Sequence, residues 1–322
     1  MPFFNNIGDR IASTRPARII INKSKETSLP GFRSIPLYDV VKFFIAQVKT
    51  VGMTERASAI AYNFFMALPP ALIFLFTLIP FLPISKEFEQ SLYSLIRDVI
   101  PGEKDHDTLI LFLKDFINKP RNGLLSLGFI LSLFFSSSAI MGIMRSFDKN
   151  YLGFKKRTGL QKRMVALKIT IVLFVLVFAS ILLLIGQSQV LKFIGIKNPT
   201  VRNIILNARW LVIIFLFFTS ISYIYRHAPA IHKKWKLINP GSILASFLML
   251  LMTLLFSWWV SHFGNYNQLY GSIGTVLILL ILIFINSLVL LIGFELNVSI
   301  TSLKKIADER KDNPADGGEN PV

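Results

Sequence analysis

Residues 57–84 read ASAIAYNFFMALPPALIFLFTLIPFLPI, and this stretch decides the class of the fold. It carries no charged side chain over 28 residues, whereas an α-helix needs only about 20 mostly apolar residues to cross a bilayer. The composition agrees, because the chain is 53% hydrophobic and 16% charged, while soluble domains are about 25% charged. The stretch therefore predicts a membrane-spanning helix.

Further runs of the same kind follow along the chain. They lie at about 123–147, 165–187, 208–226, 240–263 and 272–300. We therefore predict an all-α, polytopic membrane bundle of six transmembrane helices, with interfacial amphipathic helices beside them. This domain occupies residues 36–305.

The net charge of +17 is divided unevenly between the segments that join the spans. Nine Lys and Arg lie in the segments 85–122, 188–207 and 264–271. On the other side there are 24, in residues 1–56, 145–163, 226–239 and 301–322. Because basic segments stay in the cytoplasm, we expect both termini to be cytoplasmic. An even number of spans agrees with this orientation.

The two ends of the chain differ from the spans in composition. Residues 1–35 are polar and basic and have no apolar stretch with a small-residue cleavage site, so we expect a cytoplasmic segment and no cleaved signal peptide. Residues 306–322 include DERKDNPADGGENPV, which is charged, rich in Gly and Pro and free of aromatic residues. Such a composition predicts a disordered cytoplasmic tail.

Apolar residues at helical spacing also occur outside the six runs. Residues 37–48 have Leu, Val, Phe and Ile on one face, and Lys42 and Lys49 lie beside them, as in an interfacial helix. Residues 88–99 and 109–117 show similar spacing within the loop 85–122. Contact with lipid and packing against the bundle explain these helices equally well.

Three stretches resemble the YihY/BrkB family of inner-membrane proteins, historically misnamed ribonuclease BN. They are the first span, the segment YIYRHAPAIHKKWKLINPGSILAS (223–246), and FGNYNQLYGSIGTVLILLILIFINSLVLLIGFELNVS (263–299). The last contains Tyr266, Tyr270-Gly271, Gly293 and Glu295-Leu296-Asn297. The resemblance covers about 40–305 in the same six-span order. It implies a multi-pass protein of the bacterial inner (plasma) membrane and leaves the activity undefined.

Polar residues and prolines inside the spans are candidates for a substrate path, because polar groups in hydrocarbon need a partner. In the first span, two adjacent prolines each remove a backbone donor, which destabilises a regular helix by about 3 kcal/mol or more. We therefore expect a kink or break there. Broken helices often line substrate sites in transporters, while a static kink that shapes packing is the other interpretation. The candidates are Tyr62, Asn63, Pro69, Pro70 and Asn286.

Glu295 is the acidic residue at the end of the sixth span. Counting about 1.5 Å per residue from the start of the span places it near the cytoplasmic boundary. We expect Arg145, at the end of the second span, to be its partner, with Arg56 or Lys168 as substitutes. The pair is interpreted either as a structural link between helices or as a proton- or ion-coupling site.

Several function classes are disfavoured by composition. The chain has no cysteine and four scattered histidines, so we expect no metal site, no cofactor and no catalytic residue. The basic residues follow the membrane topology, so we expect no nucleic-acid partner. No G-x-x-x-x-G-K-[ST] motif is present, which argues against an ATPase of the P-loop type within the chain.

The remaining function classes are those of membrane proteins that are not enzymes. The leading hypothesis is a transporter or flippase of an amphipathic, lipid-linked or anionic substrate, without its own ATPase. The alternative is a non-catalytic scaffold for envelope assembly. The expected partners are membrane lipids, with a homo-oligomer or an envelope-assembly protein as further candidates.

Overall fold

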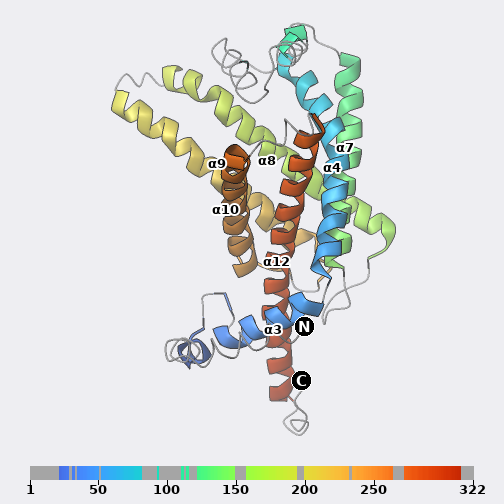
Figure 1. Cartoon of the computed structure of the whole chain (residues 1–322), viewed down its shortest axis with the longest axis vertical. Helices are drawn as coiled ribbons and strands as arrows, with labels where there is room; N and C mark the ends of the chain where they lie inside the picture. The colour runs from blue at the N-terminus through green and yellow to red at the C-terminus, as the bar shows by residue number, and fades with distance from the viewer. Residues whose placement is uncertain are drawn as a thin grey trace. The chain divides into compact units, whose positions relative to one another are not determined.

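The structure is a computed structural model that describes residues 22–28, 31–32, 35–50, 52–81, 93, 110–111, 114–115, 122–148, 157–193, 199–231, 234–263 and 272–312. The long elements within these ranges are α-helices (Figure 1). The chain folds into two compact units. The described residues of 1–58, 147–155 and 230–322 form unit 1, and those of 59–146 and 156–229 form unit 2.

The helices follow the predicted spans. Their bounds are α3 Leu37–Thr50, α4 Met53–Leu78, the 3₁₀ turn η1 Ile79–Phe81, α7 Asn122–Phe147, α8 Gly159–Phe193, α9 Pro199–His227, α10 Pro240–Phe263 and α12 Ser272–Asp312. In the part of the chain that the structure describes, five helices are long and apolar enough to cross a membrane. The expected fourth span lies within α9, whose residues Leu211–His227 form a shorter apolar helix. The all-α, polytopic class is confirmed.

Unit 1 is built on α12, with α10 beside it and α3 lying across it (Figure 1). At 1.5 Å per residue the 41 residues of α12 extend over roughly 60 Å, about twice the hydrocarbon thickness. The prediction of disorder from residue 306 is wrong for residues 306–312, which continue this helix. Good helix formers and the pair Lys305–Glu309, 3.8 Å apart at spacing i, i+4, support the extension. Residues 313–322 lie outside the described residues.

The predicted helix before the first span is confirmed as α3. Its residue Val40 is fully buried and forms a small core with Phe32, Ile35 and Ile300, the last of which belongs to α12. Packing on the bundle therefore accounts for one face of this helix. The helices expected at 88–99 and 109–117 fall almost wholly outside the described residues, and so does the N-terminal segment up to residue 21.

Between α3 and α4 the chain turns at Gly52. Gly52 has a φ of +61°, in the left-handed region that side chains with a Cβ adopt at a cost. Its carbonyl oxygen accepts a hydrogen bond from the backbone N–H of Arg56. The turn therefore sets the position of Arg56 in the first turn of α4.

Unit 2 contains α7, α8, α9 and the part of α4 from Ala59 onward. The two helices α4 and α7 approach closely at two points, where Gly142 lies against Asn63 and Gly128 lies against the backbone of Phe74. The ring of Phe74 also stacks on Phe174 of α8, with ring centres 6.2 Å apart. Aromatic and small residues therefore hold these three helices together.

The ends of α8 and α9 are completed by side chains. At the start of α8, Thr158 and Gln161 accept each other's backbone N–H, which forms a capping box. At the end of α9, the guanidinium of Arg157 donates to the carbonyl oxygens of His227, Ala228 and Pro229. The otherwise unpaired groups at both helix ends are thereby satisfied.

Of the kink or break expected at Pro69-Pro70, the break does not occur. Both prolines lie inside the continuous helix α4, although each removes the N–H that would bond the carbonyl four residues earlier, in Phe65 and Met66. A break at this depth would release further backbone groups into hydrocarbon, which costs more than two missing bonds. The double proline is therefore a local loss of hydrogen bonds and not a discontinuity.

Candidate functional site

The start of α10 is fixed by a dense set of hydrogen bonds in unit 1. The side-chain oxygen of Asn239 accepts the N–H of Ser242 at 2.8 Å, and the hydroxyl of Ser242 accepts the N–H of Asn239 at 3.3 Å. Pro240 occupies the first helical position, where its missing N–H costs nothing. The sequence Asn-Pro-Gly-Ser therefore begins this helix at a defined residue.

A residue of α12 completes the cap. The side-chain oxygen of Asn297 accepts the N–H of Gly241 at 2.9 Å, and its amide donates to the side-chain oxygen of Asn239 at 2.6 Å. Both asparagines are buried. Because a buried, unpaired backbone donor is costly, Asn297 fixes the position of α10 against α12.

Gly241 lies where the backbones of these two helices approach each other most tightly. A Cβ atom at this position would overlap the carbonyl oxygen of Gly293 and the amide of Asn297. These neighbours are backbone or a hydrogen-bonded side chain, so neither gives way cheaply. The crossing of α10 and α12 therefore requires glycine at residue 241.

The indole of Trp235 extends the same network. Its N–H donates to the hydroxyl of Thr301 at 3.1 Å, and that hydroxyl donates to the carbonyl oxygen of Asn297 at 2.8 Å. Trp235 is buried. The segment before α10 is thus attached to α12 both through Trp235 and through the cap.

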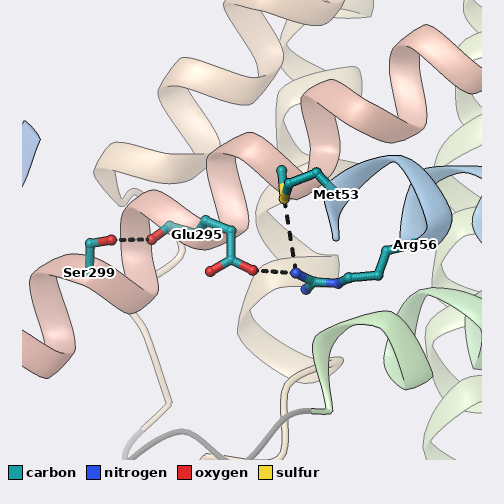
Figure 2. Close-up of polar contacts among 4 residues, drawn as sticks. All are labelled: Met53, Arg56, Glu295 and Ser299. Carbon is teal, nitrogen blue, oxygen red and sulfur yellow. Dashed lines mark hydrogen bonds and ion pairs between the residues drawn. The ribbon is translucent and has the colours of Figure 1, made fainter. Parts of the chain in front are cut away.

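Unit 1 also contains a buried ion pair (Figure 2). The guanidinium Nη1 of Arg56, in the first turn of α4, lies 2.6 Å from the carboxylate Oε1 of Glu295 on α12. The Glu295 side chain is fully buried and that of Arg56 is 9% exposed. The sulfur of Met53 lies 3.9 Å from the same guanidinium nitrogen. The pair links the start of α4 to α12.

A group of aromatic rings packs next to the ion pair through Phe294. The ring of Phe294 stacks on Phe147, with ring centres 3.9 Å apart, and Trp235 lies 5.7 Å from it at a tilt. The guanidinium of Arg56 lies 6.0 Å from the centre of the Phe294 ring. We call Arg56, Glu295, Phe294, Phe147 and Trp235 the ion-pair cluster. The two charged side chains are shielded from water, which strengthens the attraction between them.

The expected partner of Glu295 is corrected by this geometry. Glu295 is bonded to Arg56, which was the substitute, and not to Arg145. The side chain of Arg145 is exposed, and its Nε donates to the carbonyl oxygen of Met141 on its own helix. The turn at Gly52 brings Arg56 to α12. Counting residues along the spans does not predict this pairing.

The remaining candidates occupy two places. Tyr62 is 63% exposed, and Asn63 donates to the carbonyl oxygen of Ala59 at 2.6 Å, so both belong to the surface and packing of α4 in unit 2. Pro69 and Pro70 lie further along the same helix. Asn286 is in unit 1, where it donates to Leu282 of its own helix at 3.0 Å and to the hydroxyl of Thr253 on α10 at 3.4 Å.

An apolar groove begins directly after the two prolines. It has a volume of about 500 Å³ and is lined by Ala71, Phe74, Leu75 and Leu78 of α4, Phe129 of α7, and Phe174, Val175, Val177, Phe178 and Ile181 of α8. All of these residues are in unit 2. Among the described residues, no polar side chain lines the groove. Its chemistry suits a hydrocarbon chain.

Several residues of the unit 1 network were not recognised from the sequence. Asn239 and Trp235 were missed as partners of α12. Thr301, the residue of α12 that bonds Trp235, was missed as well, and so was Arg163, which donates to the hydroxyl of Ser138 at 3.0 Å in unit 2. The signal for Asn239 was present, because Asn followed by Pro is a readable helix start. The other contacts join distant segments and leave no local pattern.

Metal binding has no support in the described part of the chain. No group of three or more His, Cys, Asp or Glu lies close enough together there to hold a metal ion. Glu295, the buried carboxylate, is engaged by an arginine.

The sequence of this chain matches a known protein family. The sequence pattern described as "Virulence factor BrkB" matches residues 44–318. The chain belongs to the BrkB family. The match includes the ion pair, the cap of α10 and the groove, so this arrangement is a property of a BrkB-family chain.

Individual proteins are also similar to this BrkB-family chain. A "Putative ribonuclease-like protein YfkH" of Bacillus subtilis (strain 168) is 28% identical over 268 residues, which cover 79% of this chain and 92% of the relative. A "UPF0761 membrane protein" of Chromohalobacter salexigens is 23% identical over 243 residues, or 75% of this chain and 58% of the relative. "UPF0761 membrane protein IL2447" of Idiomarina loihiensis is 32% identical over 91 residues, which cover 28% and 32%.

Two of these three relatives are named as membrane proteins. No solved structure matches the chain. The chain is an integral, multi-pass membrane protein of the BrkB family.

Proposed function

We propose that the chain is a transporter or flippase of an amphipathic, lipid-linked or anionic substrate, without its own ATPase. The observation that carries the proposal is the apolar groove between α4, α7 and α8. Its volume of about 500 Å³ lies within the range of small-molecule sites, about 300–1,000 Å³. Aromatic and aliphatic walls without polar groups favour an acyl or isoprenoid chain as the occupant.

The double proline supports a path beside this groove. The carbonyl oxygens of Phe65 and Met66 lose their ordinary helical donors to Pro69 and Pro70, one turn before the groove begins at Ala71. Backbone acceptors at membrane depth are stable only where something supplies a donor. A hydroxyl or amide near the headgroup of an amphipathic substrate is such a donor.

The distribution of charge supports the orientation of the proposed transporter. Basic residues gather in the segments 1–56, 145–163, 226–239 and 301–322, so we place both termini in the cytoplasm of a bacterial cell and the spans in its inner membrane. Each Lys or Arg near an anionic membrane surface contributes about 1 kcal/mol of attraction. A basic face of this kind concentrates anionic substrates at the start of the path.

Lipid movement in reconstituted liposomes tests the proposal. The purified chain is placed in vesicles that contain a fluorescent phospholipid, and a membrane-impermeant quencher then reports the fraction in the outer leaflet. We expect the protected half of the fluorescence to become accessible when the chain is present, with or without an ion gradient.

Two matched variants connect the movement to the groove. Val175→Trp fills a position in the groove, and Ile171→Trp changes an equally lipid-facing position one turn earlier that does not line it. We expect the first variant to slow lipid movement and the second to leave it unchanged. Equal effects of the two would refute the groove as the path. No movement in the wild-type chain under any ion gradient, with a stable protein partner in pull-downs, would favour the envelope-assembly scaffold.

A further inference from the structure

A second cavity lies in unit 1 and shares no lining residue with the apolar groove. It has a volume of about 180 Å³ and is enclosed by Gly31, by the segment from Trp235 to Pro240, and by α12. The lining residues are Gly31, Trp235, Lys236, Ile238, Asn239, Pro240, Asn297, Ile300 and Thr301. We call it the α10 pocket. Neither the ion pair nor the groove uses it.

The charge of Lys236 determines which kind of ligand the α10 pocket favours. The polar groups of its floor are already bonded to one another, since Trp235 donates to Thr301 and Asn297 donates to Asn239. Lys236, on the rim, is the charged side chain among the lining residues, and it is exposed. An occupant with a negative charge next to Lys236 is therefore favoured over a neutral one.

Next to Lys236 lie two exposed apolar residues, of which Ile238 lines the pocket. Leu237 and Ile238 are 41% and 68% exposed, and they lie three and two residues before Pro240, where the apolar run of α10 begins. Moving apolar surface out of water is favourable by about 25 cal/mol of free energy per Å². A position at the bilayer boundary places Ile238 among acyl chains and lets Lys236 reach the phosphates.

The neighbouring helix α3 indicates the same position. Val40 faces α12 and is buried, whereas Val41 and Ile45, one helical turn apart, form a second apolar stripe that is 43% and 47% exposed. Lys42 lies beside this stripe and is exposed, which is the arrangement of a helix lying in the membrane interface. Ile300 belongs both to the core beneath α3 and to the wall of the α10 pocket.

We infer that the α10 pocket binds the phosphate headgroup of an anionic phospholipid from the adjoining leaflet. The headgroup enters beside Lys236, and the acyl chains remain in the bilayer against Ile238. A volume of 180 Å³ equals that of about six water molecules at ~30 Å³ each, which accommodates a phosphate and part of a glycerol but not an acyl chain. The inference holds whether or not the chain moves lipids.

Native mass spectrometry of the detergent-purified, full-length chain tests this inference. The chain is titrated with phosphatidylglycerol and, separately, with neutral phosphatidylcholine. We expect tighter binding of phosphatidylglycerol, and a loss of about fivefold in Lys236→Gln, which is about 1 kcal/mol. Lys234→Gln is the matched control. It removes the same charge, and Lys234 is exposed and does not line the pocket. It should bind phosphatidylglycerol as the wild type does.

The remaining arms separate a lipid site from other sources of binding. Soluble glycerol phosphate offers the same anion without acyl chains, and we expect it not to displace the lipid at tenfold excess. Ile238→Ser should weaken phosphatidylglycerol binding without lowering the midpoint of thermal unfolding. Equal losses in Lys236→Gln and Lys234→Gln, equal affinity for the neutral lipid, or displacement by glycerol phosphate would each overturn the inference.

Discussion

Arg56 and Glu295 form a buried ion pair with 2.6 Å between Nη1 and Oε1, although 239 residues separate them in the chain. The pair joins the first turn of α4 to α12. Burying two charges is costly, but removing one partner costs more, because it leaves the other charge unpaired in a site of low polarity. The stability of unit 1 should therefore depend on both residues together.

Removal of either charge should destabilise the protein strongly. We expect Arg56→Gln and Glu295→Gln each to lose about 3–5 kcal/mol, measured as a lower midpoint of thermal unfolding in detergent. Arg145→Gln is the control, because Arg145 is exposed and bonds its own helix, and its midpoint should stay near that of the wild type. A larger loss in Arg145→Gln than in Arg56→Gln would contradict the pairing.

Exchange of the two charges should restore part of the lost stability. The double variant Arg56→Glu with Glu295→Arg keeps one charge of each sign at the site, so its unfolding midpoint should exceed that of either single reversal. The same proteins in liposomes address the role of Glu295. Recovery of both folding and lipid movement would exclude a coupling carboxylate and leave a structural link.

Gly241 should not tolerate a side chain. We expect Gly241→Ala to destabilise by about 1–3 kcal/mol, as overpacking does, because its Cβ would overlap the carbonyl oxygen of Gly293. Gly123→Ala is the control, since a Cβ at Gly123 has no neighbour within 4 Å and alanine favours helix by roughly 0.5–1 kcal/mol. Thermal unfolding of both variants measures the difference. Similar midpoints would show that the crossing of α10 and α12 is looser than described.

Asn297 should matter more than Asn286, although both are amides on α12. Asn297→Leu leaves the N–H of Gly241 buried without its acceptor, which costs about 1–3 kcal/mol. Asn286→Leu removes a bond of 3.4 Å to Thr253 and places an apolar side chain in the bilayer. We expect a lower unfolding midpoint for the first variant only. An equal decrease in both would argue that the cap is not the main link between α10 and α12.

The spans were predictable because hydropathy acts over many residues at once. The expected first residue of α10 was residue 240, and the helix begins at Pro240, since Asn239 and Pro240 mark a helix start locally. At Pro69-Pro70 a kink or a break was expected, and α4 is continuous there, since breaking a helix inside hydrocarbon costs more than the two missing hydrogen bonds. The partner of Glu295 could not be predicted in the same way, because three basic residues lay near the expected end of the span. The choice of Arg56 depends on the turn at Gly52.

Nuclease activity should be absent from the purified chain, in spite of the name of its Bacillus subtilis relative. Glu295, the buried carboxylate of unit 1, is bonded to Arg56, and the composition offers no thiolate and four histidines. Incubation with labelled RNA and added divalent cations should leave the RNA intact. Cleavage that a point change in this chain abolishes would contradict the expectation.

The orientation in the membrane can be tested because the chain contains no cysteine, so a single introduced thiol reports one position. Lys305→Cys lies on the exposed side of the extension of α12, and Asn267→Cys lies in the segment 264–271, which has no basic residue. The positive-inside rule predicts that a membrane-impermeant maleimide labels Asn267→Cys in right-side-out vesicles and Lys305→Cys in inside-out vesicles. The opposite pattern would reverse the topology. It would also place the α10 pocket in the leaflet facing away from the cytoplasm, because α12 carries both Lys305 and the pocket residue Thr301.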